Sequence, residues 1–148
     1  MQNILKTTVT CPKCGAQEEF TIYNFVNEKE QPGVGNIIGD YTAHLHFCSK
    51  CDARVLYPYP TIYEDLENNV VFAYGTSKEE AKQIREKFKS LKAGKSDVYG
   101  NFKLRLFTNL ENFVGAVALH NIEHHFDEEG YREFEKRMQE IEEILGCN

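Results

Sequence analysis

The sequence of 148 residues lacks any apolar run of about 20 residues, the length that a transmembrane helix requires. It also lacks a phosphate-binding glycine motif, because Gly33-Val34-Gly35 has no predicted strand before it and no predicted helix after it. No serine or cysteine nucleophile has a recognisable base, and residues 1–6 contain no basic region followed by an apolar run. These absences predict a cytoplasmic protein without a membrane segment, and they favour a non-enzymatic role.

The composition is sufficient for an ordinary hydrophobic core. Hydrophobic residues make up 41% of the chain and aromatic residues 12%, which suits one or two small domains. The formal net charge is −6, and this acidic balance disfavours general binding to nucleic acid. The charge is unevenly distributed, with a local charge of +4 over residues 78–95 and of −6 over residues 123–143.

Two C-x-x-C steps are the strongest signal in the sequence. Two residues between cysteines allow one tight turn to aim both sulfurs at one ion, and two such steps supply the four thiolates of a closed, tetrahedral zinc site. Gly15 and Asp52 follow the two steps, where both residue types tolerate the left-handed conformation that closes such a turn. The sequence predicts one structural Zn²⁺ per chain, with the ligands Cys11, Cys14, Cys48 and Cys51.

Other chemistry for these cysteines has less support. Disulfides require an oxidising compartment, for which we find no secretory signal. A thioredoxin-like redox motif requires a single C-x-x-C after a strand of a βαβ unit. A catalytic zinc requires an open coordination position, which four thiolates do not leave. An iron–sulfur cluster uses the same ligands, and the spacing leaves that alternative open.

The order of predicted elements indicates an α+β fold. We expect a β-rich zinc ribbon over residues 1–75, made of two hairpins that each bend at a C-x-x-C step, and an α+β helical part over residues 76–148 packed on it. The alternation of apolar residues predicts a third ribbon strand at 41–47 after a polar loop at 27–36. Capping boxes at Ser77 and Thr108 predict helices beginning there, and a third helix is expected over 128–145, so the second part has about three helices.

The chain resembles the CpXC family, prokaryotic proteins with paired Cys-Pro-x-Cys motifs. The resemblance depends on Cys11-Pro12-Lys13-Cys14-Gly15, on Cys48-Ser49-Lys50-Cys51 and on Tyr57-Pro58-Tyr59-Pro60 with the segment that follows it. It covers the first half of the chain well and the second half loosely. The second motif departs from the pattern, because Ser49 replaces proline and Asp52 replaces glycine. The resemblance implies a zinc-binding fold and no particular reaction.

Histidines form the other group with potential chemistry. His120 and His124 are one helical turn apart, as two metal ligands on a helix can be, and Glu123 and His125 lie beside them. The H-E-x-x-H pattern is absent, so we expect a structural role: His124 buried on the stripe of Phe113, and His120 nearer the polar edge. A metal-dependent hydrolase using His120 and His124 is the alternative. His44 and His46 share a predicted strand face and either support the zinc ligands or face solvent.

Three further features bear on partners. A basic stripe on the first long helix can contact phosphates, remain solvated or pair with the acidic third helix; it consists of Lys78, Lys82, Arg85, Lys89 and Lys92. Tyr57, Tyr59 and Tyr63 are expected to pack between the two parts, and Cys147 to be a free thiol. We expect an interaction module that binds another protein, with a nucleic-acid-associated ribbon as the alternative. The sequence does not predict the oligomeric state.

Overall fold

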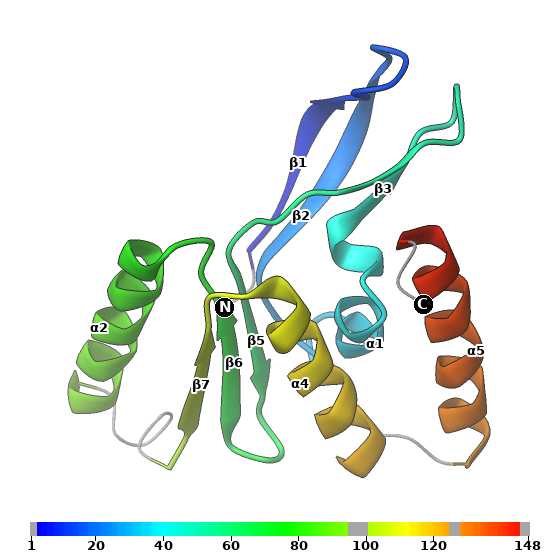
Figure 1. The fold of residues 1–148 in the computed structure, drawn as a ribbon. Helices are drawn as coiled ribbons and strands as arrows, with labels where there is room; N and C mark the ends of the chain where they lie inside the picture. The colour runs from blue at the N-terminus through cyan, green and yellow to red at the C-terminus, as the bar shows by residue number, and fades with distance from the viewer. Residues whose placement is uncertain (1–2, 95–100, 125–127, 146–148) are drawn as a thin grey trace.

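The computed structural model of the chain describes residues 3–94, 101–124 and 128–145 (Figure 1). It is a mixed α+β structure with four α-helices, three of them long, in these residues. The strands are β1 (Asn3–Thr10), β2 (Gln17–Asn27), β3 (Leu45–Phe47), β4 (Arg54–Leu56), β5 (Thr61–Asp65), β6 (Val70–Tyr74) and β7 (Lys103–Phe107). The helices are α1 (Val34–Gly39), the 3₁₀ turn η1 (Thr42–His44), α2 (Lys78–Gly94), α4 (Leu110–His124) and α5 (Glu128–Leu145).

Five of the strands form one sheet in the order β1-β2-β5-β6-β7. The pairs β1–β2 and β5–β6 are antiparallel, whereas β2–β5 and β6–β7 are parallel. Helix α2 makes the crossover between the parallel strands β6 and β7. The first hairpin of the predicted ribbon is therefore continuous with the sheet of the second part.

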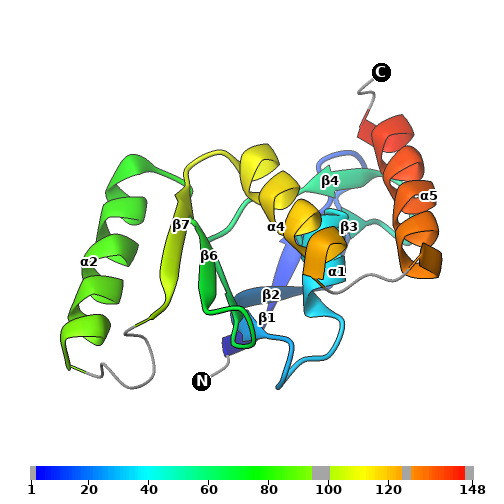
Figure 2. The ribbon, with the colours of Figure 1, turned by 90° about the horizontal axis from the view of Figure 1, so that it is seen from below.

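Side chains of β6 alternate between two cores on opposite faces of the sheet. Val70, Phe72 and Tyr74 pack with residues of α1 and α4, while Val71 packs with Phe88 of α2. This division follows from the period of two residues in a strand. Figure 2 shows α2 on one side of the sheet and α4 with α1 on the other.

The long helices begin close to their predicted positions. The Ser77 hydroxyl accepts a hydrogen bond from the Glu80 N–H at 3.1 Å, as the predicted cap of α2 requires. The second capping prediction was wrong by one residue, because Asn109 and not Thr108 caps α4: its Oδ1 accepts from the Asn112 N–H at 2.9 Å. Asparagine is at least as good a cap as threonine, and it places the cap directly before Leu110.

The segment between the two C-x-x-C steps differs most from the prediction. The expected loop at 27–36 overlaps a helix: Gly33 is the N-cap of α1, and Val34 and Gly35 are its first two residues, where no helix was predicted. The expected strand at 41–47 is a 3₁₀ turn followed by the three residues of β3. Close approach explains the position of α1: a Cβ on Gly39 would lie 3.2 Å from the Ala118 Cα of α4.

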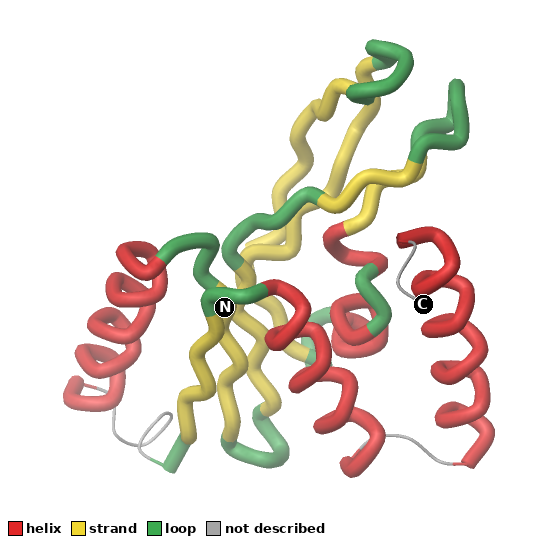
Figure 3. Tube along the Cα trace, viewed as in Figure 1, coloured by secondary structure: helices red, strands yellow, loops and turns green. Residues whose placement is uncertain are grey.

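Two hairpins extend away from the helices and end in the cysteine turns. The β1–β2 hairpin continues beyond the sheet, and the β3–β4 hairpin runs beside it as a separate two-stranded sheet (Figures 1 and 3). In Figure 3 the two tips are loops that lie at the same end of the molecule. We call these two hairpins with their tips, residues 3–27 and 45–56, the arm.

Helices α2 and α5 lie at opposite ends of the molecule in both views (Figures 1 and 2). The basic stripe of α2 is therefore not neutralised by the acidic α5 within one chain. Helix α5 is instead tied to the end of α1 by Arg137, whose Nη2 lies 2.9 Å from Oδ2 of the buried Asp40. None of the described helices is both long and apolar enough to cross a membrane.

Candidate metal centre

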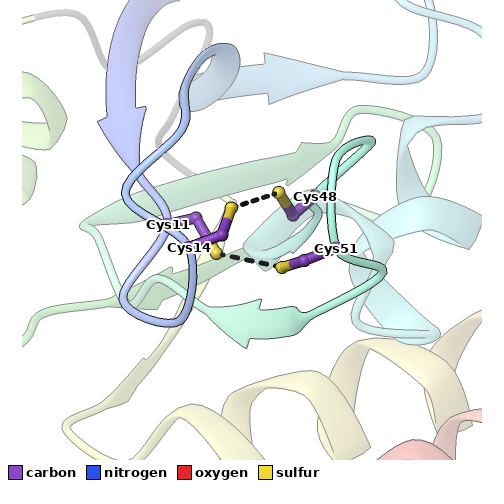
Figure 4. A group of neighbouring side chains, drawn as sticks. All are labelled: Cys11, Cys14, Cys48 and Cys51. Carbon is purple, nitrogen blue, oxygen red and sulfur yellow. Dashed lines mark hydrogen bonds between the residues drawn. The ribbon is translucent and has the colours of Figure 1, made fainter.

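The tips of the arm bring four cysteines together (Figure 4). Their Sγ atoms all lie within 4.8 Å of one another, with 3.5 Å between Cys11 and Cys51 and 3.6 Å between Cys14 and Cys48. A disulfide would need about 2.05 Å, so the thiols are free. Four sulfurs about 2.3 Å from one Zn²⁺ would be separated by about 3.8 Å, close to the two spacings observed. The predicted cluster can hold a metal ion.

Both turns have the same backbone conformation, as the sequence predicted. In the first, the Gly15 N–H donates to the Cys11 carbonyl at 2.9 Å; in the second, the Asp52 N–H donates to the Cys48 carbonyl at 3.0 Å. Gly15 has φ 77° and Asp52 has φ 62°, the left-handed conformation expected of both. The second turn therefore forms the same local structure with an aspartate in place of glycine.

The pKa values of the cysteine thiols are shifted in opposite directions. Backbone N–H groups, first that of Cys14, lower the pKa of Cys11 to about 6. The Ala53 N–H also lowers the pKa of Cys51, but loss of solvent and the neighbouring sulfurs outweigh it and raise the pKa to about 12. The backbone thus favours thiolates, while their mutual repulsion opposes a full set of four. A cation at the centre would remove that repulsion.

Glu18 of β2 links the two hairpins beside the cluster. Its carboxylate accepts hydrogen bonds from the backbone N–H of Ser49 at 3.0 Å and from the Ser49 hydroxyl. Nε2 of His46 lies 3.1 Å from the same carboxylate. These bonds, those of Ser49 first, lower the pKa of Glu18 to about 2. The sequence analysis missed Glu18, because an acidic residue in a strand carries no signal for a contact 31 residues away.

The two histidines near the second cysteine pair have different environments. His46 is linked to the second cysteine turn through Glu18, which also accepts a hydrogen bond from Ser49. His44 lies in η1 and not on a strand face shared with His46, so that prediction was wrong. Its ring is fully buried, stacks on Tyr59 at 4.3 Å and has Nε2 2.8 Å from the Thr61 hydroxyl. Burial lowers the pKa of His44 to about 4.

The expected orientation of His120 and His124 was reversed. His120 is the buried residue, with Nε2 2.6 Å from Oδ2 of Asp65, whereas the side chain of His124 is 41% exposed. Asp65, the last residue of β5, supplies the polar partner that stabilises this buried imidazole. Among the described residues, the four cysteines are the only group of three or more potential His, Cys, Asp or Glu ligands in close contact. His125 lies outside the described residues.

Of the three tyrosines, Tyr63 packs in the core with residues of α4 as expected, whereas Tyr57 and Tyr59 form hydrogen bonds within the predicted ribbon. Tyr63 is fully buried, and Tyr59 is 7% exposed with its hydroxyl donating to the Ala43 carbonyl at 2.7 Å and accepting from the Tyr23 N–H. The Tyr57 hydroxyl donates to the Thr10 carbonyl, between the two hairpins of the arm. In the basic stripe, Lys78, Lys82, Arg85 and Lys89 are exposed. The side chain of Lys92 and all of Cys147 lie outside the described residues.

Comparison with known proteins identifies the family. The model of the family described as CpXC protein matches residues 9–126, which is most of the chain and includes both cysteine turns. The chain belongs to the CpXC family. The match extends further into the second half than the sequence resemblance indicated, through α2, β7 and α4. No curated protein matches the chain, and no solved structure matches it.

The structure explains how this CpXC protein tolerates serine in its second motif. Proline has no N–H, so a proline at position 49 could not donate the backbone hydrogen bond that Ser49 gives to Glu18. Serine at this position supplies two donors to one carboxylate. The departure from Cys-Pro-x-Cys thus coincides with a contact between β2 and the second cysteine turn.

Proposed function

We propose that this CpXC protein binds one structural Zn²⁺ through Cys11, Cys14, Cys48 and Cys51, and that the metal fixes the arm as a rigid surface for another protein. The observation that carries the proposal is the position of the four thiols at the two tips of the arm. One ion there would tie two hairpins that belong to separate sheets. Four thiolates select soft or borderline metals, and tetrahedral sulfur coordination is typical of zinc.

An exposed aromatic side chain supports a protein as the partner. Phe47, next to Cys48, is 46% exposed, and the Arg54 guanidinium lies 5.6 Å from the centre of its ring. The two residues are opposite each other in the β3–β4 pair. Aromatic residues and arginine are the side chains most enriched in the energetically dominant parts of protein interfaces.

Metal content tests the first part of the proposal. We expect elemental analysis to give one zinc per chain for the wild type and a large loss for Cys14→Ser and Cys51→Ser. Cys147→Ser is the matched control, because it removes a thiol that belongs to neither motif, and it should retain the metal. A wild-type protein purified without chelator that holds no zinc, or holds iron in its place, contradicts the proposal.

Partner capture tests the second part. The tagged wild-type protein should retain a specific protein from an extract of its native cells, and Phe47→Ser and Arg54→Glu should each reduce that capture about tenfold, as expected of central interface residues. Leu119→Ser is the control, because Leu119 on α4 is also exposed, at 57%. Equal loss in the Leu119 variant, or no loss in the arm variants, refutes the assignment of the arm.

A further inference from the structure

A polar cavity lies apart from the cysteines, where β2 and β5 end. These two strands are parallel neighbours, and Asn27 and Asp65 are their last residues. In open sheets, ligands bind outside the carboxyl ends of parallel strands. The cavity has a volume of about 440 Å³, and its lining includes Glu28, Lys29, Gly33, Asn36, Asp65, Leu66, Glu67 and Asn121.

A buried amide lines this cavity with an unused acceptor. Asn121 of α4 is 2% exposed, and its Oδ1 has no hydrogen-bond partner among the described residues. An unsatisfied buried polar atom is costly, so native structures pair nearly all of them with protein, water or ligand. The Asn121 oxygen is therefore an acceptor at the cavity wall that still lacks a donor.

The side chains of Glu28, Tyr63 and Asn121 converge on Gly35, with the Nδ2 end of the Asn121 amide toward the glycine. A Cβ built on Gly35 of α1 would lie 2.7 Å from Oε1 of Glu28, 2.7 Å from the Tyr63 hydroxyl and 2.8 Å from Nδ2 of Asn121. Only glycine leaves room for this arrangement. Glu28 and Asn121, which also line the cavity, are thus held in place by close packing against Gly35.

Beside the donors of Lys29, the lining offers free acceptors on carboxylates. Oε2 of Glu28 accepts one hydrogen bond, from the Gly33 N–H at 2.8 Å, and can accept a second. Glu67 adds an exposed carboxylate, and Lys29 is the one cation in the described lining. Asp65 adds little, because both its oxygens already accept bonds from the turn at residues 67–68 and from His120.

We propose that this cavity binds the ammonium group of a small organic amine. An ammonium donates three hydrogen bonds and carries the charge that Glu28 and Glu67 favour, and Oδ1 of Asn121 takes one of the donors. A directly coordinated metal fits less well, since among the described residues the carboxylates here and His120 do not form a group of three or more closely spaced ligands. The site is independent of the proposed zinc function.

Calorimetry with 1,4-diaminobutane tests this inference on the zinc-loaded full chain. We expect saturable binding to the wild type, a loss of affinity of at least about fivefold in Glu67→Gln, and no detectable binding in Asn121→Leu. Glu86→Gln on α2 removes the same charge far from the cavity and should leave the affinity unchanged. Glu67 is exposed, so its variant retains the fold even if the Asn121 variant does not.

Two further probes separate hydrogen bonding from charge. The fully methylated, diquaternary analogue of diaminobutane has the same charge but no N–H donor, and it should bind much more weakly than the amine. Mg²⁺ should not compete with the amine. Equal binding of the analogue, equal weakening by Glu67→Gln and Glu86→Gln, displacement of the amine by Mg²⁺, or no heat of binding at about 10 mM amine would each overturn the inference.

Discussion

His44 provides a test of the core that joins the arm to the helices. Its imidazole is fully buried, stacked on Tyr59 and packed edge-on against Tyr74 and Phe113. Its Nε2 shares a hydrogen bond with the Thr61 hydroxyl. In this environment the charged imidazolium is unfavourable, which is why burial lowers the pKa from 6.5 to about 4.

The sign of the pH effect follows from this lowered pKa. Between about pH 6.5 and about pH 4, His44 is protonated in the unfolded chain but neutral in the folded protein. The unfolding free energy therefore decreases as the pH falls through this range. With these two pKa values, lowering the pH from about 7.5 to about 5.5 costs about 1.4 kcal/mol of unfolding free energy through His44 alone.

Denaturant unfolding of wild type and His44→Gln at the two pH values measures this contribution. Glutamine can still pair with Thr61 but does not titrate. Any pH dependence that comes from metal binding or from the other histidines is the same in both proteins and cancels in the comparison. We expect the difference in unfolding free energy between wild type and variant to shrink by about 1.4 kcal/mol at the lower pH. Parallel pH profiles for the two proteins would refute the reasoning.

Three further predictions concern the surfaces and motifs described above. Ser49→Pro should restore the family motif and retain zinc. Proteolysis of the second cysteine turn should nevertheless be faster in Ser49→Pro than in Ser49→Ala, because only proline removes the N–H donor to Glu18. Equal rates of cleavage would contradict this. Generic DNA or RNA should bind weakly at physiological salt, given a net charge of −8 once four thiolates and Zn²⁺ are included. Sub-micromolar binding that is lost when Lys82, Arg85 and Lys89 become Glu would instead establish the basic stripe as a nucleic-acid surface. Replacing both His120 and His124 with Gln should leave the zinc content at one ion per chain, and a fall from two ions to one would reveal a second metal site.

Features that are determined by residues close together in the sequence were predictable. The spacing of Cys11 and Cys14, repeated at Cys48 and Cys51, sets the turn geometry within a few residues, and Ser77 caps the helix that follows it. The α+β class and the three long helices follow from the periodicity of their apolar residues. These patterns depend on residues that are close in sequence, so they can be recognised without knowledge of the tertiary structure.

Features stabilised by distant partners were not predictable. Helix α1 is six residues long, and no side chain caps it from its own N-cap position. Its first turn is completed by Glu28, which accepts from the Gly33 and Gly35 N–H groups, and its last turn depends on the close approach to Ala118. Likewise no strand was predicted at β5, which carries two buried acids, Glu64 and Asp65. A long-range partner such as His120 makes such burial possible.

The two proposed sites differ in how much they depend on metal. The cysteine cluster is at the tips of the arm, and none of its four residues belongs to either hydrophobic core cluster of the sheet and helices. The polar cavity is formed by the ends of β2 and β5 and by Asn121, next to the core that contains Val26, Tyr63 and Val117. The free energy of metal binding stabilises the part of the fold that carries the ligands, and here that part is the arm. Loss of zinc should therefore release the two hairpins from each other, while the cavity keeps the packing that shapes it.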